Sequence, residues 1–100
     1  MRALLTVFAL ISFASLADAA VTYGGGNGET IDKAIEVLGA SGEIEGVPSE
    51  YVWVAQHFPG CKRDAQSLTS NAGRDIDVLE FTCANQKRVF YFDITDFFGK

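Results

Sequence analysis

The 100-residue sequence contains few of the residues on which catalysis and metal binding most often depend. Its one histidine is His57, and its two cysteines are Cys61 and Cys83. A nucleophile needs a base beside it, and the Pro-Gly pair between His57 and Cys61 ends any helix that could hold both on one face. A zinc site needs at least three protein ligands, which these residues supply only if the cysteines stay unbonded. We therefore expect no catalytic residues, no metal and no cofactor.

Basic residues are also scarce. The sequence has 8 lysines and arginines against 13 acidic residues, and its net charge is −5. The deficit lies in residues 20–57, where Lys33 is the one base, whereas acids and bases are balanced in residues 58–100. Binding nucleic acid requires a basic stripe, which this sequence lacks. We expect no nucleic acid partner, and the charge fits either a cationic protein as the partner or simple solubility.

Long hydrophobic runs are absent except at the amino terminus. Arg2 precedes an uncharged apolar run of about a dozen residues, which is too short to cross a bilayer as a helix. Ala17 and Ala19 form the small-residue pattern that signal peptidase recognises. Residues 1–19 are thus predicted to be a cleavable signal peptide, with no membrane span after its removal. This predicts a periplasmic or secreted protein.

Export changes what is expected of the cysteines. Two cysteines in a small exported domain most economically form one bridge. A disulfide between Cys61 and Cys83 closes a loop of about 23 residues and should stabilise the fold by about 3 kcal/mol. Because the mature domain is small, its hydrophobic core benefits from such a cross-link. The bridge also removes both cysteines from the candidates for catalysis.

The first residues after the predicted cleavage site give weak structural signals. Four glycines lie between Gly24 and Gly28, and the backbone entropy of glycine makes order costly, so residues 20–29 are predicted to be a flexible leader. Residues 30–38 fit two patterns. The spacing of their apolar residues fits a helix, whereas the alternation around Glu36 is typical of a strand. We prefer a strand, because it would cover an edge of the sheet.

The clearest helix is predicted to begin at Pro48, since proline is favoured in the first helical position, and to end before Pro59. Glu50 would then lie near the positive end of the helix dipole. One continuous apolar face consists of Val47, Tyr51, Val54, Ala55 and Phe58. We expect this face to pack on a sheet.

Three strands are predicted in the second half of the chain, at residues 66–70, 75–83 and 88–94. Apolar residues of the second strand switch faces between Val78 and Leu79, which predicts a β-bulge there. The aromatic tail, Phe97 and Phe98, is expected to fold back onto the core. The predicted fold class is α+β: a small antiparallel sheet of three to four strands, one helix packed across it and one disulfide. Residues 30–100 are expected to form this single domain.

In the predicted helix, Trp53 points away from the apolar face. Glu50 and His57 flank it at spacings of three and four residues, which places all three side chains on one stripe. Such a stripe could bind a partner, because tryptophan is enriched at interface hot spots. Alternatively, Trp53 packs under the 41–46 loop or under the Phe97-Phe98 tail. We prefer packing for Trp53, because tryptophan in small domains is mostly buried.

These features favour a small exported acidic binding module that recognises another protein without catalysis, through Glu50, Trp53 and His57. A small carboxylate-dependent hydrolase or lyase is the alternative from another class. It would show a concave pocket holding a carboxylate of raised pKa. A further alternative is an envelope stability or assembly factor that binds no ligand.

Overall fold

The computed structural model describes residues 20–100. The predicted signal peptide, residues 1–19, lies outside the described residues. The elements are β1 (Thr22–Gly25), the 3-10 helix η2 (Ile31–Lys33), β2 (Ile35–Leu38), α2 (Glu43–His57), β3 (Lys62–Asn71), β4 (Arg74–Cys83) and β5 (Gln86–Asp93). Within residues 20–100, no helix has the length and apolar character needed to cross a membrane.

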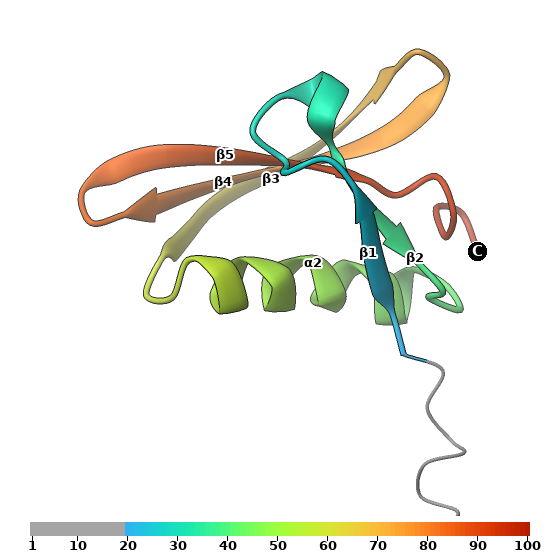
Figure 1. Cartoon of the computed structure of the whole chain (residues 1–100), viewed down its shortest axis with the longest axis horizontal. Helices are drawn as coiled ribbons and strands as arrows, with labels where there is room; N and C mark the ends of the chain where they lie inside the picture. Colours follow the sequence, from blue (N-terminus) through green and yellow to red (C-terminus); the bar gives the residue numbers. More distant parts are fainter. Residues whose placement is uncertain (1–19) are drawn as a thin grey trace, which may run out of the picture.

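The strands form one five-stranded sheet in the order β1-β2-β5-β4-β3. Neighbouring strands are antiparallel except β2 and β5, which run parallel. Helix α2 lies along one face of the sheet, and η2 with its flanking loop lies on the other side (Figure 1). The fold is therefore α+β with one helix across the sheet, as predicted. The sheet has five strands rather than three to four, and it is mixed rather than antiparallel.

The prediction of a flexible leader at residues 20–29 is wrong. All four residues of β1 pair with β2, and the Tyr23 hydroxyl donates to the backbone carbonyl of Ser49 on α2 (2.7 Å). Gly28 is buried, and its carbonyl accepts a hydrogen bond from the Tyr91 amide (3.0 Å). Its φ is +80°, and a Cβ there would lie 2.4 Å from a carbon of Ile35. These glycines permit close packing, so the domain begins before residue 30.

Residues 30–38 combine the two predicted forms. The single 3-10 turn of η2 precedes β2, so the preferred strand is present in the second half of this segment. Ile35 and Val37 are buried, and Glu36 between them lies on the opposite face. In the sheet, β2 lies between β1 and β5. β2 therefore covers the free edge of β5, as predicted, and β1 in turn pairs with the other side of β2.

The centre of the core lies between β4, β5 and α2. The register pairs Leu79 with Phe90 and Asp77 with Phe92, and these paired residues share the face of the sheet that α2 covers. The two phenylalanines and Leu79 are at most 2% exposed. Residues on the alternate positions of β4, such as Val78, lie on the other face.

The pairing of β4 with β5 is continuous from residue 76 to residue 83, so the predicted bulge at Val78 and Leu79 is wrong. The apolar residues of β4 change faces because Asp77, a polar residue, occupies an inward position. An irregularity does occur in the neighbouring strand β3, between Arg63 and Ala65. The change of face in the apolar pattern therefore comes from this one polar residue, Asp77, and the backbone of β4 is regular.

Helix α2 begins at Glu43 rather than at Pro48, which lies inside the helix. Proline has no amide hydrogen, so the carbonyl of Ile44 receives no helical hydrogen bond. Both Pro48 and Ile44 are exposed, so water can satisfy that carbonyl. Glu43 and Glu45 in the first turn complement the helix dipole, which supports this earlier start.

The buried face of α2 includes most of the predicted one and extends beyond it. Val54 is in the core, Val47, Tyr51 and Phe58 pack against the core, and only Ala55 of the predicted face is exposed. The buried residues of α2 are Gly46, Ser49, Glu50, Trp53 and Val54. Gly46 faces Phe97, and a Cβ at Gly46 would lie 2.5 Å from the phenyl ring. Phe97 itself is fully buried, which confirms the prediction that the tail folds back onto the core for this residue, whereas Phe98 is 37% exposed. The close approach at Gly46 helps to fix which side of the helix faces the sheet.

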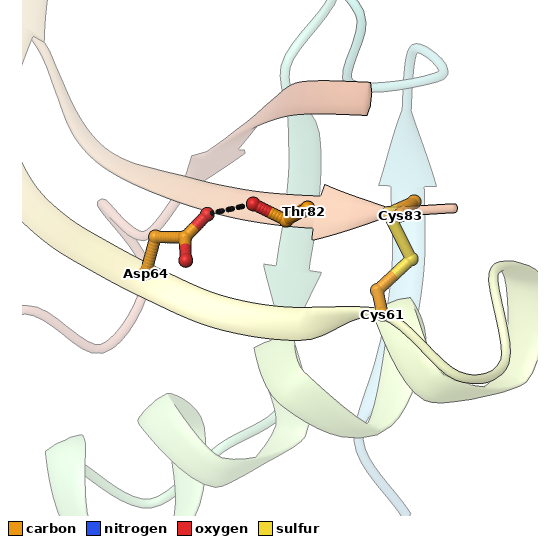
Figure 2. The surroundings of a disulfide bond; sticks show 4 residues. All are labelled: Cys61, Asp64, Thr82 and Cys83. Atoms are coloured by element: carbon orange, nitrogen blue, oxygen red, sulfur yellow. Dashed lines mark hydrogen bonds between the residues drawn. A yellow bond between two sulfur atoms is a disulfide. The ribbon is translucent and has the colours of Figure 1, made fainter. Parts of the chain in front are cut away.

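The disulfide between Cys61 and Cys83 is present, as predicted, with an S–S distance of 2.04 Å (Figure 2). It joins the residue before β3 to the last residue of β4. Nearby, the Thr82 hydroxyl donates to Asp64 Oδ2 (2.6 Å), and Asp64 is the residue at the irregularity of β3 (Figure 2). The cross-link and this hydrogen bond attach the first residues of β3 to β4.

Candidate functional site

Trp53 is 8% exposed, so it is packed, as preferred from the sequence. Its aromatic neighbours are on β5 and at the end of α2, where His57 and Phe58 lie, rather than in the 41–46 loop or the C-terminal tail. The Trp53 ring meets Phe90 and Phe92 edge-on, at centroid distances of 5.9 and 5.7 Å. Edge-on contacts of this kind are favourable between aromatic rings. Trp53 therefore contributes to the core of the domain.

The residues of the predicted binding stripe share one side of α2, but only His57 is on the surface. The His57 ring stacks on Trp53 at a centroid distance of 4.0 Å, and its Nδ1 donates to the Trp53 carbonyl (2.9 Å). Glu50 is 0% exposed. The expectation that the stripe points outward is therefore wrong for Glu50 and Trp53. The apolar pattern of the sequence does not reveal this burial, because Gly46 and Glu50 are not apolar and yet lie on the buried side of the helix.

Glu50 is an unusual residue for the core. Neither of its carboxyl oxygens makes a hydrogen bond with the described residues. Burial, and after it the neighbouring Asp77 carboxyl, raise the pKa of Glu50 to about 10. Asp77 is 3% exposed, and its Oδ2 accepts a hydrogen bond from Gln66 Nε2 (2.8 Å). Glu50 is thus a neutral carboxylic acid at pH 7, beside a buried Asp77.

This carboxyl pair bears on the alternative of a carboxylate-dependent enzyme. That alternative requires one carboxyl that has a raised pKa and also lines a pocket. The two properties fall on different residues: Glu50 has the raised pKa and is sealed from solvent, whereas Asp77 lines a cavity. A general acid must come within hydrogen-bonding distance of its substrate. Glu50 does not reach the surface in this structure.

The largest feature that sequence analysis missed is the outer edge of β3. This strand ends the sheet, so no strand among residues 20–100 pairs with its outer side. Nine of its ten residues are exposed, and Leu68 among them is 53% exposed. The other edge strand, β1, has only four residues. An edge strand leaves a row of amide and carbonyl groups available to another chain.

Proteins usually protect such edges with charges, prolines or bulges. β3 has this protection only at its beginning, where Lys62 and Arg63 precede the irregularity at Asp64. Residues 65–71 contain no charged residue and no proline. This seven-residue stretch, from Ala65 to Asn71, is an unprotected sheet edge. The signal was visible in the sequence, but only the topology shows that this strand lies at an edge.

A cavity of about 190 Å³ lies beside the unprotected edge, between α2, β3 and the C-terminal tail. Its buried part contains Asp77, Ile94 and Phe97. Its exposed part contains Leu68 and Glu43 among others. The remaining lining residues are Val47, Gln66 and Phe98. The cavity therefore has apolar walls, one carboxylate in its floor and another at its mouth.

A second cavity, of about 440 Å³, lies on the opposite face of the sheet between η2 and the β3–β4 turn. Its lining contains two cations, Lys33 and Arg74, and Arg74 donates from Nε to Asp93 Oδ2 (2.7 Å). Burial acts to raise the pKa of Asp93, but hydrogen bonds from Thr95 and Arg74 outweigh it and lower that pKa. The charges of Arg74 and Asp93 are thus already paired within the protein.

Residues 20–100 contain no group of three or more histidine, cysteine, aspartate or glutamate side chains that could hold a metal ion. The chain was also compared with known proteins. No family model matches it, and neither a curated protein nor a solved structure matches it.

Proposed function

We propose that this chain is a small acidic binding module that recognises an extended, cationic segment of another protein by adding it as a further strand beside β3. The observation that carries the proposal is the unprotected edge, residues 65–71, at the end of the five-stranded sheet. Strand addition is a common mode of peptide recognition, in which main-chain hydrogen bonds supply affinity.

The distribution of charge around β3 supports a cationic partner. Four basic residues gather where β3 and β5 begin, on either side of β4. In the strand register, Lys62 and Lys87 lie opposite Thr82. Arg63 and Arg88 lie opposite Phe81. These bases would repel a cationic segment from the first residues of β3. The unprotected edge lies beyond them, and the acidic residues Glu43, Asp77 and Asp32 lie near its side chains. Charge complementarity thus favours residues 65–71 as the docking segment.

The oxidised Cys61–Cys83 bridge supports a site of action outside the reducing cytoplasm, in the periplasm or the extracellular space. In that location a partner segment would be an extended part of a secreted or envelope protein. The proposed activity needs no cofactor, because the backbone of β3 supplies the recognition groups.

The proposal is tested with peptides selected on the full chain from a displayed library of random peptides of about ten residues. The affinities of the best binders are then compared for the wild type, Thr69→Lys and Thr22→Lys. Both threonines are exposed, and each lies on an edge strand, at opposite ends of the sheet. Either substitution leaves the core untouched, and each variant's melting temperature checks that.

We expect selected peptides to be rich in β-branched and basic residues, and Thr69→Lys to weaken their binding about tenfold or more. Thr22→Lys should leave binding unchanged. Peptides that bind both variants as well as they bind the wild type would show that β3 is not the site. Selection of mainly acidic peptides would contradict the cationic partner.

A further inference from the structure

We propose that the cavity between α2, β3 and the C-terminal tail binds one lysine or arginine side chain of the added strand. This inference rests on the proposed strand addition and names what the site selects. The cavity is the one lined by Asp77 at its floor and Glu43 at its mouth.

The position of the cavity follows from the register of β3. Gln66 and Leu68 line it, and their pairing with Leu79 and Asp77 places both on the helix-covered face of the sheet. Directly opposed residues on neighbouring strands project their side chains to the same face. A residue of the added strand that pairs with Gln66 or Leu68 therefore directs its side chain toward this cavity.

The size of the cavity suits one long side chain. Its volume of about 190 Å³ slightly exceeds that of a cavity of about 150 Å³ that accepts a benzene molecule. Ile94 and Phe97 form a buried apolar wall, while Leu68 and Phe98 are partly exposed at the entrance. Lysine and arginine combine an aliphatic stem with a cationic end, so the stem can lie against these apolar groups.

The charge of the cavity sets the preference for a cation. Its lining contains two carboxylates and no lysine or arginine. Asp77 is 3% exposed, its Oδ2 accepts a hydrogen bond from Gln66 Nε2, and its nearest acidic neighbour is the carboxyl of Glu50. Glu43 at the mouth accepts a hydrogen bond from the Gly99 amide through Oε2 (2.9 Å), which holds its carboxylate beside the entrance. A buried carboxylate gains most from a partner of opposite charge.

The test uses two synthetic peptides of about ten residues, built of alternating threonine and valine with soluble glycine-serine ends. One carries a central lysine, and its twin carries norleucine, which keeps the aliphatic stem and removes the charge. Affinities for the full chain are measured by calorimetry. Aromatic NMR signals of Phe97 and Phe98 report whether the cavity is occupied.

We expect the lysine peptide to bind about tenfold tighter than its twin and to shift the Phe97 and Phe98 signals more strongly. Glu43→Gln should reduce that preference severalfold, and Asp77→Asn should abolish it. Glu45→Gln, an exposed change in the same helical turn, is the matched control and should preserve it. Because Asp77 is buried, Glu43→Gln, which retains an acceptor for the Gly99 amide, keeps the test valid if Asp77→Asn fails to fold.

The outcomes separate the two proposals. If both peptides bind equally and Thr69→Lys weakens both, strand addition stands and the cavity does not select a cation. If the preference for lysine persists in Glu43→Gln and Asp77→Asn, the cation binds elsewhere and this inference is wrong. If neither peptide binds, strand addition fails and the cavity inference fails with it.

Discussion

Glu50 is an ionisable residue in the middle of the core, and its protonation couples the stability of the domain to pH. Its pKa is raised from 4.5 to about 10 by burial and then by Asp77. Between these two pH values the folded protein holds a proton on Glu50 that the unfolded chain releases. Since the folded state binds more protons in this window, its stability falls as pH rises through it.

Glu50→Gln removes this proton requirement while keeping the size and shape of the side chain. We predict that the variant is more stable than the wild type by about 1–3 kcal/mol at pH 8, and that the difference shrinks toward pH 5. Urea unfolding of both proteins at the two pH values measures this. Glu45→Gln, on the exposed side of the helix, should follow the wild type. Parallel pH dependence in the wild type and Glu50→Gln would contradict the assignment.

The same residue shows what limits inference from sequence at this scale. Burial of a carboxylic acid cannot be read from apolar periodicity, because Glu50 counts as polar in any such pattern. The burial of Gly46 cannot be read from the pattern either, because glycine is not counted as apolar and its partner, Phe97, is in the tail at the far end of the chain. Because of these two residues, the buried face is wider than the predicted one and extends to Trp53. Trp53 could be expected to pack from its residue type alone.

At the scale of elements, the disulfide holds the weakest part of β3 in place. The first residues of this strand are exposed and contain an irregularity, and the bridge and the Thr82–Asp64 hydrogen bond attach them to β4. The bridge closes a loop with a sequence separation of 22 residues. It therefore restricts the unfolded chain as well as the strand.

Replacing both Cys61 and Cys83 by alanine should lower the free energy of unfolding by about 2–4 kcal/mol. Amide hydrogen exchange should also become faster in the first residues of β3 than in β4, because β4 is paired on both sides. Denaturant unfolding and exchange measured on the same samples check both expectations. An unchanged midpoint with unchanged exchange would show that β3 is held without the bridge.

The three C-terminal strands, the disulfide and the existence of one helix could be predicted because their signals are local. Alternating apolar residues, turns at fixed spacing and an even cysteine count need no knowledge of distant contacts. β1 could not be predicted, since its glycines are indistinguishable from a linker until β2 and Tyr91 lie against them. The early helix start was missed because Pro48 was assigned to the first helical position.

At the scale of the whole molecule, the proposed function depends on which strand ends the sheet. β3 stays at the edge because β2, which is distant in sequence, pairs with β5 and not with β3. Sequence alone gave the acidic character and the expected cationic partner, but it located the binding surface on α2. The structure moves the candidate surface to β3 and the adjacent cavity, because Glu50 and Trp53 are buried.

The charge distribution supports the same location. The basic residues at the beginning of β3 and β5 lie at the end of the sheet nearest the disulfide. The carboxylates of the cavity lie farther along β3. A cationic segment therefore meets repulsion at one end of the strand and attraction at the other. We propose that this difference sets where along β3 the segment binds.

Hydrogen exchange of the β3 backbone amides, with and without a selected basic peptide, tests strand addition most directly. Amides of residues 65–71 that point away from β4 exchange freely in the unbound protein, because nothing among residues 20–100 pairs with that edge. We predict that peptide binding slows the exchange of these amides at least tenfold, while the amides of β1 at the opposite edge are unchanged. Protection elsewhere with no change at residues 65–71 would contradict the proposed role of this edge.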